Sequence, residues 1–348
     1  MYKNFDLENI KFSVDLGAKF LIAKQQLNGS YPGHDQGAAS FWGIPLALML
    51  SGYHFEAQKL LDWIQKNALS LNGDIGEISK NSRGYNYPYE KAWLIEGAHR
   101  FGEFNISYSG MNYLRRFWDQ ETGGFYSVID PDLIKLESNL KMDLWVTSGC
   151  ARAALYMGEL DMAIGAARWM ENLMKQQPNY PEQLYTVFTK SKGLLINKND
   201  FTDDIEDKFK FGTNFRYVLN KDSQVDQSFF HPGIAGGFLA LLYLATRDIR
   251  WLTLSKKYML LAETASDFLY STLRAGKTGW AAALLFSISK EEKYFKIAYK
   301  IADNIIKLQS GNGSWIDPNK ISDMHSINLT AEMVIWLNQI HRYIKPRY

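Results

Sequence analysis

Apolar residues recur at helical spacing in two kinds of segment that alternate along the chain. The first kind has one apolar stripe and one polar face, as in residues 6–26, and predicts an amphipathic helix with one face in solvent. The second kind is apolar on nearly every side and rich in small residues, as in residues 36–51, and predicts a helix that is buried all round. A glycine such as Gly52 ends the buried kind. The pattern therefore predicts hairpins that each join one inner and one outer helix.

The alternation predicts six inner and six outer helices. The inner segments are 36–51, 88–101, 143–157, 232–246, 277–289 and 326–344. The outer segments are 6–26, 56–69, 103–120, 159–177, 250–270 and 291–309. The first helix has no inner partner before it and the last has no outer partner after it, so these two complete a sixth hairpin if the ring closes. We expect one all-α domain over residues 1–348.

Three outer helices end in similar glycine turns that are followed by an aromatic residue. The clearest is LQSGNGSW at 308–315, and looser copies end at Tyr31 and Phe125. The spacing of their glutamines, from Gln26 to Gln309, implies a repeat of about 47 residues, a period typical of repeat architectures. Glycine tolerates the positive φ of such turns. We expect each ring to fold back and clamp the helix ends.

One interval between outer-helix ends does not fit the repeat. The other ends lie 46 to 56 residues apart, but the interval that contains residues 181–226 is 87 residues long. Within it, PEQLYTVFTKSKGLLI alternates polar and apolar residues around a Lys-Gly turn, which predicts a β-hairpin between hairpins three and four. A loop of this length in a compact domain favours a lid or rim over a cavity mouth. The alternatives are a decorative insertion and an oligomer contact.

The ring of helical hairpins resembles the α/α-toroid superfamily. The stretch QSGNGSW is similar to the QW repeat of terpenoid cyclases and protein prenyltransferase β-subunits. The six-hairpin pattern also resembles toroids that process sugars, such as N-acylglucosamine epimerases and unsaturated glucuronyl hydrolases. The resemblance implies a closed (α/α)6 toroid with a small β insertion. It also implies a substrate cavity at the N-terminal ends of the inner helices.

The sequence departs from three chemistries of this superfamily. It contains no DxDD acid of the kind that protonates an alkene in squalene-type cyclases. The D-x-C zinc arrangement of prenyltransferases is missing, because Ser148 stands two residues before Cys150. Lanthionine cyclases need two cysteine ligands, and this chain has a single cysteine. We therefore expect none of these three reactions.

The amino-acid composition limits which binding partners and which cellular location we expect for the protein. The chain has 39 basic and 37 acidic residues, a formal net charge of +2, and no basic run interleaved with aromatics, so we expect no nucleic-acid partner. Aromatic residues make up 14% of the sequence, which suits a large core or an aromatic-lined cavity. One cysteine excludes a disulfide framework. No apolar run is long enough to span a bilayer and the N-terminus lacks a signal h-region, so we expect a cytoplasmic protein, with a homo-oligomer left open.

The toroid resemblance places the candidate site residues where the inner helices begin. The residues expected to act in catalysis are acids and one histidine: Glu332, Asp143, Glu90, Asp226 and His231. The residues expected to bind substrate are His34, Asp35, Tyr85, Tyr87, Tyr89, Trp93, Trp145, Trp280, His325 and Asn328. The tyrosines and tryptophans can stack on a sugar or stabilise a cation through their ring faces.

Several of these residues have a second interpretation. Asp35 and Asp143 stand where helix N-caps stand. Glu332 lies within the apolar run LTAEMVIWL, where an acid is either paired in the core or a proton donor with a raised pKa. A single histidine in a loop, such as His231, is more often structural than catalytic. These alternatives stay open on the sequence alone.

No metal site is expected. His34, His231 and His325 all fall on the side of the predicted cavity, which is the number of histidines that a zinc site needs. None of them has a helical partner at HxxxH spacing. The acidic string DDIED at 203–207 formally matches the DDxxD motif of class I terpene synthases, but it lies in a polar insertion and predicts solvated charge.

The favoured function is a cofactor-independent acid–base enzyme of the cyclase, isomerase or dehydratase type, acting on a mostly apolar, isoprenoid-like or polyene small molecule. No glycine-rich phosphate loop follows a strand, so no organic cofactor is expected. Glu332 or Asp143 is the expected acid, with Glu90, Asp226 or His231 as the base. The alternatives are a carbohydrate-active toroid (an epimerase, glycoside hydrolase or lyase) and a non-catalytic binding scaffold.

Overall fold

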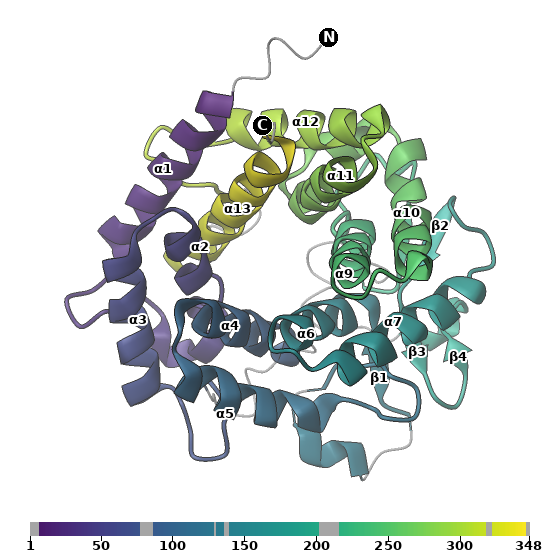
Figure 1. Ribbon diagram of the computed structural model, residues 1–348, viewed down its shortest axis with the longest axis horizontal. Coiled ribbons are helices and arrows are strands. Elements are labelled where there is room, and N and C mark those ends of the chain that lie inside the picture. The colour runs from purple at the N-terminus through teal and green to yellow at the C-terminus, as the bar shows by residue number, and fades with distance from the viewer. Residues whose placement is uncertain are drawn as a thin grey trace.

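The computed structural model describes residues 7–76, 86–128, 130–135, 139–201, 216–317 and 322–345, arranged as two concentric layers of helices (Figure 1). The inner layer contains α2 (Ile44–Leu50), α4 (Tyr87–Phe101), α6 (Leu144–Tyr156), α9 (His231–Thr246), α11 (Gly276–Ser289) and α13 (Asp323–Ile344). The outer layer contains α1 (Leu7–Lys24), α3 (His54–Asn67), α5 (Phe104–Leu114), α7 (Leu160–Lys175), α10 (Ile249–Thr264) and α12 (Glu292–Lys307). The predicted alternation of inner and outer helices is the one observed.

Each inner helix packs against its neighbours in the inner layer. Contacts run from α2 to α4, α6, α9, α11 and α13 in turn, and α13 also contacts α2 and α1. The first and last helices of the described chain therefore lie side by side, as the purple and yellow ribbons of Figure 1 show. No helix in the described ranges combines the length and the apolar character that a membrane crossing requires.

Small residues let the inner helices approach one another closely. A Cβ atom added at Gly233 of α9 would lie 2.2 Å from the backbone of Thr278 in α11. One added at Gly237, a helical turn later, would lie 2.3 Å from the ring of Trp280. Both distances are well below van der Waals contact, so these positions require glycine. The close approach of α9 and α11 at these two glycines holds Trp280 of α11 against α9.

The first inner helix is shorter than predicted. The sequence predicts a continuous helix over 36–51, but a 3₁₀ helix (His34–Ser40) and a break precede α2. Gly37 has a φ of 82°, which interrupts any helix, and Pro45 occupies the first turn of α2, where its missing N–H is not needed. A second predicted helix, 250–270, ends early at Thr264 and continues as the 3₁₀ helices Asp267–Ser271 and Leu273–Ala275.

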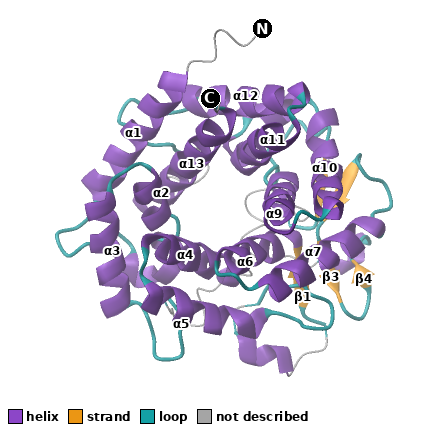
Figure 2. Ribbon diagram, viewed as in Figure 1, coloured by secondary structure: helices purple, strands orange, loops and turns teal. Residues whose placement is uncertain are grey.

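Short antiparallel strands occupy the described part of the predicted insertion. β2 (Gln183–Tyr185) pairs with β5 (Val218–Asn220), and β3 (Val187–Thr189) pairs with both β4 (Gly193–Leu194) and β1 (Lys141–Asp143). The strands gather at one edge of the ring beside α7 (Figure 2). Because β1 runs directly into α6, this sheet is attached where an inner helix begins. Its role as a lid stays a prediction.

Four glycine turns hold consecutive outer helices together. Gly29, Gly73, Gly123 and Gly313 have φ values of 91°, 90°, 87° and 90°. A Cβ atom at any of them would lie 2.1 to 2.3 Å from a backbone carbonyl oxygen of the next outer helix, which is α3, α5, α7 and α1 respectively. The residues two positions after these glycines are completely buried: Tyr31, Ile75, Phe125 and Trp315. The clamps predicted from the sequence are therefore contacts between neighbouring hairpins.

The side chain of Gln25 links the first turn to α3, while Gln26 bonds to Ser30 within the turn. The Gln25 Nε2 donates to the Gly29 carbonyl at 3.1 Å and to a carbonyl of α3 at 2.9 Å. Gln309 makes the same two bonds to its own turn and to α1, both at 2.9 Å. In the third copy, Asp119 stands at this position. Adjacent polar residues in the sequence give no signal of which side chain reaches the next helix.

The clamp contact can be tested by a pair of alanine substitutions in the first hairpin. Gly29→Ala places a methyl group against a carbonyl oxygen of α3 at a positive φ, and we expect it to lower the free energy of unfolding by about 2–4 kcal/mol. Gly52 has a φ of 86° but nothing within 4 Å of the added atom, so Gly52→Ala isolates the backbone strain, about 1 kcal/mol. Urea denaturation measures both values. Equal losses would mean that the carbonyl contact has no energetic importance.

Candidate active site at the ring axis

A buried ion pair joins two inner helices near the N-terminal end of α11. The Lys277 Nζ atom lies 3.2 Å from Oε1 and 3.1 Å from Oε2 of Glu332 on α13. The Lys277 side chain is 5% exposed and that of Glu332 is 19% exposed. Burial is the largest single influence on the pKa of Lys277 and acts to lower it, but Glu332 and Tyr89 together raise it by more, so the net pKa is raised. Lys277 therefore stays cationic at neutral pH.

Aromatic rings surround this ammonium group. The Lys277 Nζ atom lies 5.1 Å from the ring centroid of Phe230, 5.3 Å from that of Trp336 and 5.9 Å from that of Tyr89. Trp145 continues the wall, with its ring centroid 4.9 Å from those of both Tyr89 and Phe230. The faces of aromatic rings attract cations, and the attraction is stronger where water is excluded. The pair is thus held in an aromatic cage.

Two neutral proton-carrying groups lie beside the pair. Burial raises the pKa of Tyr89, so its hydroxyl stays protonated. His231 begins α9, and burial lowers its pKa to about 4, with the charges of Asp143 and Lys277 also acting on it. The Nδ1 atom of His231 lies 3.1 Å from the Ser228 carbonyl oxygen, so the proton of the neutral ring is on Nδ1.

Asp143 is the N-cap of α6, one of the two interpretations that the sequence left open. Its Oδ1 accepts the Val146 N–H at 2.8 Å. Its Oδ2 accepts from the Ser127 hydroxyl at 2.5 Å and from Arg216 at 3.2 Å. The side chain is almost completely buried. These contacts hold Asp143 as a paired carboxylate, and a catalytic role for it stays a prediction.

A polar cluster, partly open to solvent, lies where α11 and α13 begin. Arg274 is 2.7 Å from Asp226 and 3.6 Å from Asp317. His325 lies 3.8 Å from Asp317, and the Thr272 hydroxyl donates to Asp226 at 2.7 Å. The four charged or titratable side chains are between 15% and 35% exposed. The structure thus gathers two predicted residues, Asp226 and His325, at one polar rim.

Tyr87 and Glu90 lie in other contacts. The Tyr87 hydroxyl donates to Asp74, and the Lys91 ammonium lies 3.9 Å from the Tyr87 ring centroid. Lys91 is buried and 3.4 Å from Asp74. Glu90 accepts from the side chain of Asn86 at 3.1 Å. These contacts tie the start of α4 to the glycine turn at Gly73, and none of them includes Lys277 or Glu332.

The remaining predicted binding residues are spread around the start of the ring. The His34 ring packs on Trp63 with centroids 5.2 Å apart, and the side-chain amide of Asn328 donates to the carbonyl of Ala39. Tyr85, the side chain of Asp35 and the acidic string 203–207 lie outside the described residues. Among the residues that are described, no three His, Cys, Asp or Glu side chains form a group that could hold a metal ion.

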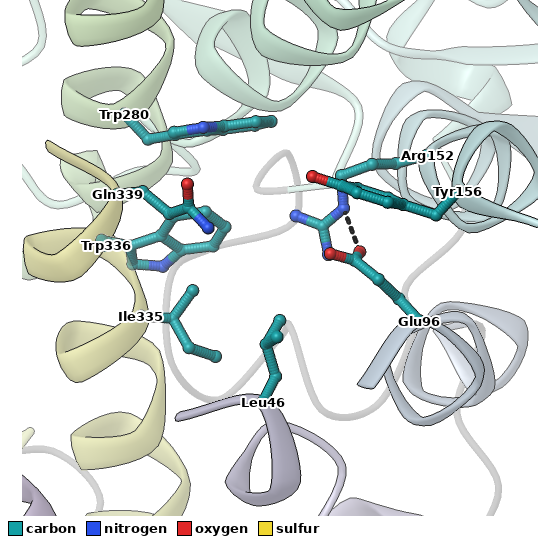
Figure 3. A pocket seen from close by; sticks show the side chains of 8 residues that line it. All are labelled: Leu46, Glu96, Arg152, Tyr156, Trp280, Ile335, Trp336 and Gln339. Atoms are coloured by element: carbon teal, nitrogen blue, oxygen red, sulfur yellow. Dashed lines mark ion pairs between the residues drawn. The ribbon is translucent and has the colours of Figure 1, made fainter. Parts of the chain in front are cut away.

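A second group of polar residues lies further along the axis, toward the C-terminal ends of the inner helices. Figure 3 shows the pocket, which is lined by Leu46, Glu96, Arg152, Tyr156, Trp280, Ile335, Trp336 and Gln339. The Arg152 guanidinium lies 3.8 Å from the ring centroid of Trp93 and 5.7 Å from that of Trp280. Sequence reasoning placed only Trp93 and Trp280 in the site. The missed signal was a charged residue, Glu96 or Arg152, inside a segment predicted to be buried all round.

No protein-family model and no curated protein matches the chain in sequence. Solved structures do match it in fold over nearly their whole length. A D-mannose isomerase aligns with a TM-score of 0.64 at 13% identity, covering 98% of this chain and 100% of that one. The GH76A α-1,6-mannanase of Salegentibacter sp. HEL1_6, bound to α-1,6-mannotriose, aligns with a TM-score of 0.61 at 11% identity, covering 96% and 99%.

The type II terpene cyclase MstE from Scytonema, in complex with its product merosterolic acid A, aligns with a TM-score of 0.58 at 14% identity, covering 97% of this chain and 98% of the cyclase. All three similar proteins are enzymes with the α/α-toroid fold. The resemblance that the sequence indicated is confirmed, and the chain has this fold. At these identities the likeness concerns the fold alone.

The Lys277–Glu332 pair should behave as a buried pair in a double-mutant cycle. We expect Lys277→Met and Glu332→Gln each to lower the free energy of unfolding by about 2–4 kcal/mol, because each leaves one buried charge unpaired. The double variant should lose less than the sum of the two. The exposed pair Lys307–Asp303 is the control, with an expected coupling below about 1 kcal/mol. Additive losses at Lys277 and Glu332 would contradict a buried pair.

His231 should make the stability depend on pH. Its pKa falls from 6.5 in the unfolded chain to about 4 in the folded protein, so the unfolded state binds more protons between these pH values. The contribution is complete above pH 6.5 and is lost as the pH falls toward 4, about 3 kcal/mol in all. His231→Gln should flatten this slope in urea titrations at pH 7.5, 6 and 5. The exposed His54→Gln variant should keep the wild-type slope, and identical slopes in both variants would refute the assignment.

Proposed function

We propose that the protein is an acid–base enzyme that acts beside Lys277 and Glu332, on a small molecule with a mostly apolar, unsaturated body. The observation that carries the proposal is the ion pair between the first turn of α11 and the middle of α13, held in an aromatic cage. We take the frame to be a closed (α/α)6 ring of six hairpins, in which this position lies on the axis. The likeness to a terpene cyclase and to an isomerase supports an enzyme of this general kind.

The charges favour proton abstraction over alkene protonation. Protonation of an alkene requires a carboxylic acid that holds its proton, whereas the Glu332 carboxyl group forms an ion pair with the Lys277 ammonium group at 3.1 Å. A carboxylate in this setting acts as a general base. Isomerase and dehydratase chemistry therefore fits the site better than cyclisation started by a protonated carboxyl group.

The neighbours of Glu332 can assist a proton transfer that begins and ends at its carboxylate. Lys277 remains cationic and can stabilise negative charge that develops on a substrate oxygen when Glu332 removes a proton. The protonated Glu332 can then return the same proton to another atom of the substrate, which restores its carboxylate, while Tyr89 keeps its hydroxyl proton beside Lys277 and can donate a hydrogen bond to the substrate oxygen. Phe230, Trp145 and Trp336 supply an apolar wall that excludes water. Each group is on the chain itself, so no cofactor is invoked.

A carbohydrate substrate is the second candidate, and the polar rim favours it. Asp226, Arg274, Asp317 and His325 offer hydrogen-bonding groups of the kind that recognise sugar hydroxyls, and rings such as Trp145 can stack on a sugar face. The mannose isomerase and the mannanase with similar folds act on sugars according to their names. In this case the same Glu332 would serve as the base of an epimerase or isomerase.

A thermal-shift screen with two ligand panels separates these candidates. One panel contains prenyl diphosphates and terpene alcohols, and the other contains amino sugars and uronic acids. A ligand at one hundred times its dissociation constant stabilises the folded state by about 2.7 kcal/mol, or a few degrees in Tm. We expect the terpenoid panel to raise Tm. A shift by sugars alone would select the second candidate, and no shift from either panel would favour a binding scaffold.

Active ligands from that screen should then be tested on variants. Glu332→Gln should abolish turnover of any substrate found, or reduce it by at least about a hundredfold, because an amide cannot accept the proton. Asp303→Asn removes a carboxylate from an exposed pair on α12 and should leave turnover unchanged. Turnover within a few-fold of wild type in Glu332→Gln would remove Glu332 from the reaction.

A further inference from the structure

We infer that the substrate carries a carbonyl group next to a C–H bond, and that Lys277 and Tyr89 bind the carbonyl oxygen while Glu332 removes the proton. The inference rests on the function proposed above and names the chemical class of its substrate. It follows from the strength of Glu332 as a base and from the hydrogen-bond donors that stand beside it.

Glu332 is too weak a base for an ordinary hydrocarbon. A carboxylate is among the weaker bases that enzymes use, and the Lys277 ammonium group already engages both of its oxygens, at 3.2 and 3.1 Å. Such a base works only where the proton that it accepts is unusually acidic. An isolated alkene or an alcohol has no C–H bond of this kind. A carbonyl group supplies one, because the electron pair of the broken C–H bond moves onto the carbonyl oxygen as an enolate.

Two donors beside Glu332 are left for the carbonyl oxygen. An ammonium group has three N–H bonds, and the two hydrogen bonds of Lys277 within the described ranges both go to Glu332. The hydroxyl of Tyr89 is buried and makes no hydrogen bond of normal length and angle in the described part of the chain. Tyr89 also raises the pKa of Lys277, so the two groups lie close together. A buried hydroxyl without a partner is costly, and an acceptor is therefore expected opposite it.

The charge at this position suits an enolate better than a neutral carbonyl group. The Lys277 side chain is 5% exposed, and the rings of Phe230 and Trp336 lie 5.1 and 5.3 Å from its ammonium group. Donors that are fixed in a water-poor site stabilise a developing oxyanion more than the carbonyl group of the ground state. The ammonium and the Glu332 carboxylate are in direct contact. This matches a substrate in which only a few bonds separate the oxygen from the acidic hydrogen.

The proton transfer balances without a further reactant. Glu332 accepts the proton as the C–H bond breaks, a carbon–carbon double bond forms, and the oxygen carries the negative charge beside Lys277 and Tyr89. The proton then returns from Glu332 to carbon, at its first position or, in a conjugated substrate, at another carbon. The Glu332 side chain is 19% exposed, so solvent can exchange the proton before it returns. Exchange of hydrogen for deuterium therefore reports this step.

The test is deuterium exchange into an apolar ketone, geranylacetone, by the full chain in heavy water. NMR follows the loss of the proton signals beside the carbonyl group, and the alcohol made by reducing the same ketone is the control probe. We expect the wild-type protein to exchange the ketone at least about a hundredfold faster than buffer, and to leave the alcohol unchanged. No exchange of the ketone would overturn the carbonyl class. Turnover of another ligand that depended on Glu332 would then leave the proposed function standing.

Variants separate the inference from the proposed function. Glu332→Gln should remove the exchange, because an amide does not accept the proton. Tyr89→Phe removes one donor to the oxygen, and it should slow the exchange by at least about tenfold with a KM within a few-fold of wild type. Tyr53→Phe removes a hydroxyl that donates to Asp15 at 2.6 Å, far from the pair, and is the matched control with an unchanged rate.

Each remaining outcome contradicts a different statement. Exchange that disappears in Glu332→Gln but is unchanged in Tyr89→Phe would remove Tyr89 from the oxygen-binding site and leave the base in place. Exchange that survives in Glu332→Gln would overturn both the inference and the proposed function. If Tyr89→Phe does not fold, the comparison of ketone with alcohol in the wild-type protein still decides the substrate class.

Discussion

The contact between a glycine and a backbone carbonyl oxygen sets the geometry of the outer layer. At Gly29, Gly73, Gly123 and Gly313 the turn after one outer helix touches the main chain of the next, at a distance that leaves no space for a Cβ atom. Each contact thus fixes the spacing of two hairpins. The buried residue two positions later then packs beneath the same turn. Because the four turns have nearly the same φ, neighbouring hairpins meet in nearly the same way, and their inner helices face a common axis.

The pairing of charged side chains inside the ring depends on how the hairpins are placed relative to one another. The axis is lined by aromatic rings, and two cations lie among them, Lys277 with Glu332 and Arg152 with Glu96. Each ion pair joins two different inner helices, so neither is a property of one segment of chain. Both cations also contact aromatic faces, which lowers the cost of holding a charge away from water. The two pairs differ in their carboxylates. Glu332 forms an ion pair with Lys277, whereas Glu96 forms ion pairs with both Arg152 and Arg100. The first pair is therefore neutral, and the second cluster is positive.

Part of the candidate site could be predicted from the sequence, and particular residues show why the rest could not. Glu332 and Tyr89 were identified because they stand in apolar or aromatic surroundings near the start of an inner helix, and they do lie together beside Lys277. Tyr87 is only two residues from Tyr89, yet its hydroxyl is bonded to Asp74. A one-residue change in a helix rotates a side chain by about 100°, and no sequence pattern fixes that phase. Glu96 and Arg152 were missed because they stand in the second half of α4 and α6, far from the helix beginnings, and their partners lie on other helices.

The sequence by itself determined the order and kind of the helices in the described ranges, because apolar periodicity and glycine stops are local properties that each segment carries alone. It also determined the glycine turns, since only glycine tolerates their backbone conformation. The tertiary structure decided which charges meet, which residue of each helix faces the axis, and where helices end early, as α10 does at Thr264. These outcomes depend on contacts between segments far apart in the chain, such as Lys277 with Glu332 and Arg152 with Glu96. The energy of such a contact exists only once the ring has brought both partners out of water.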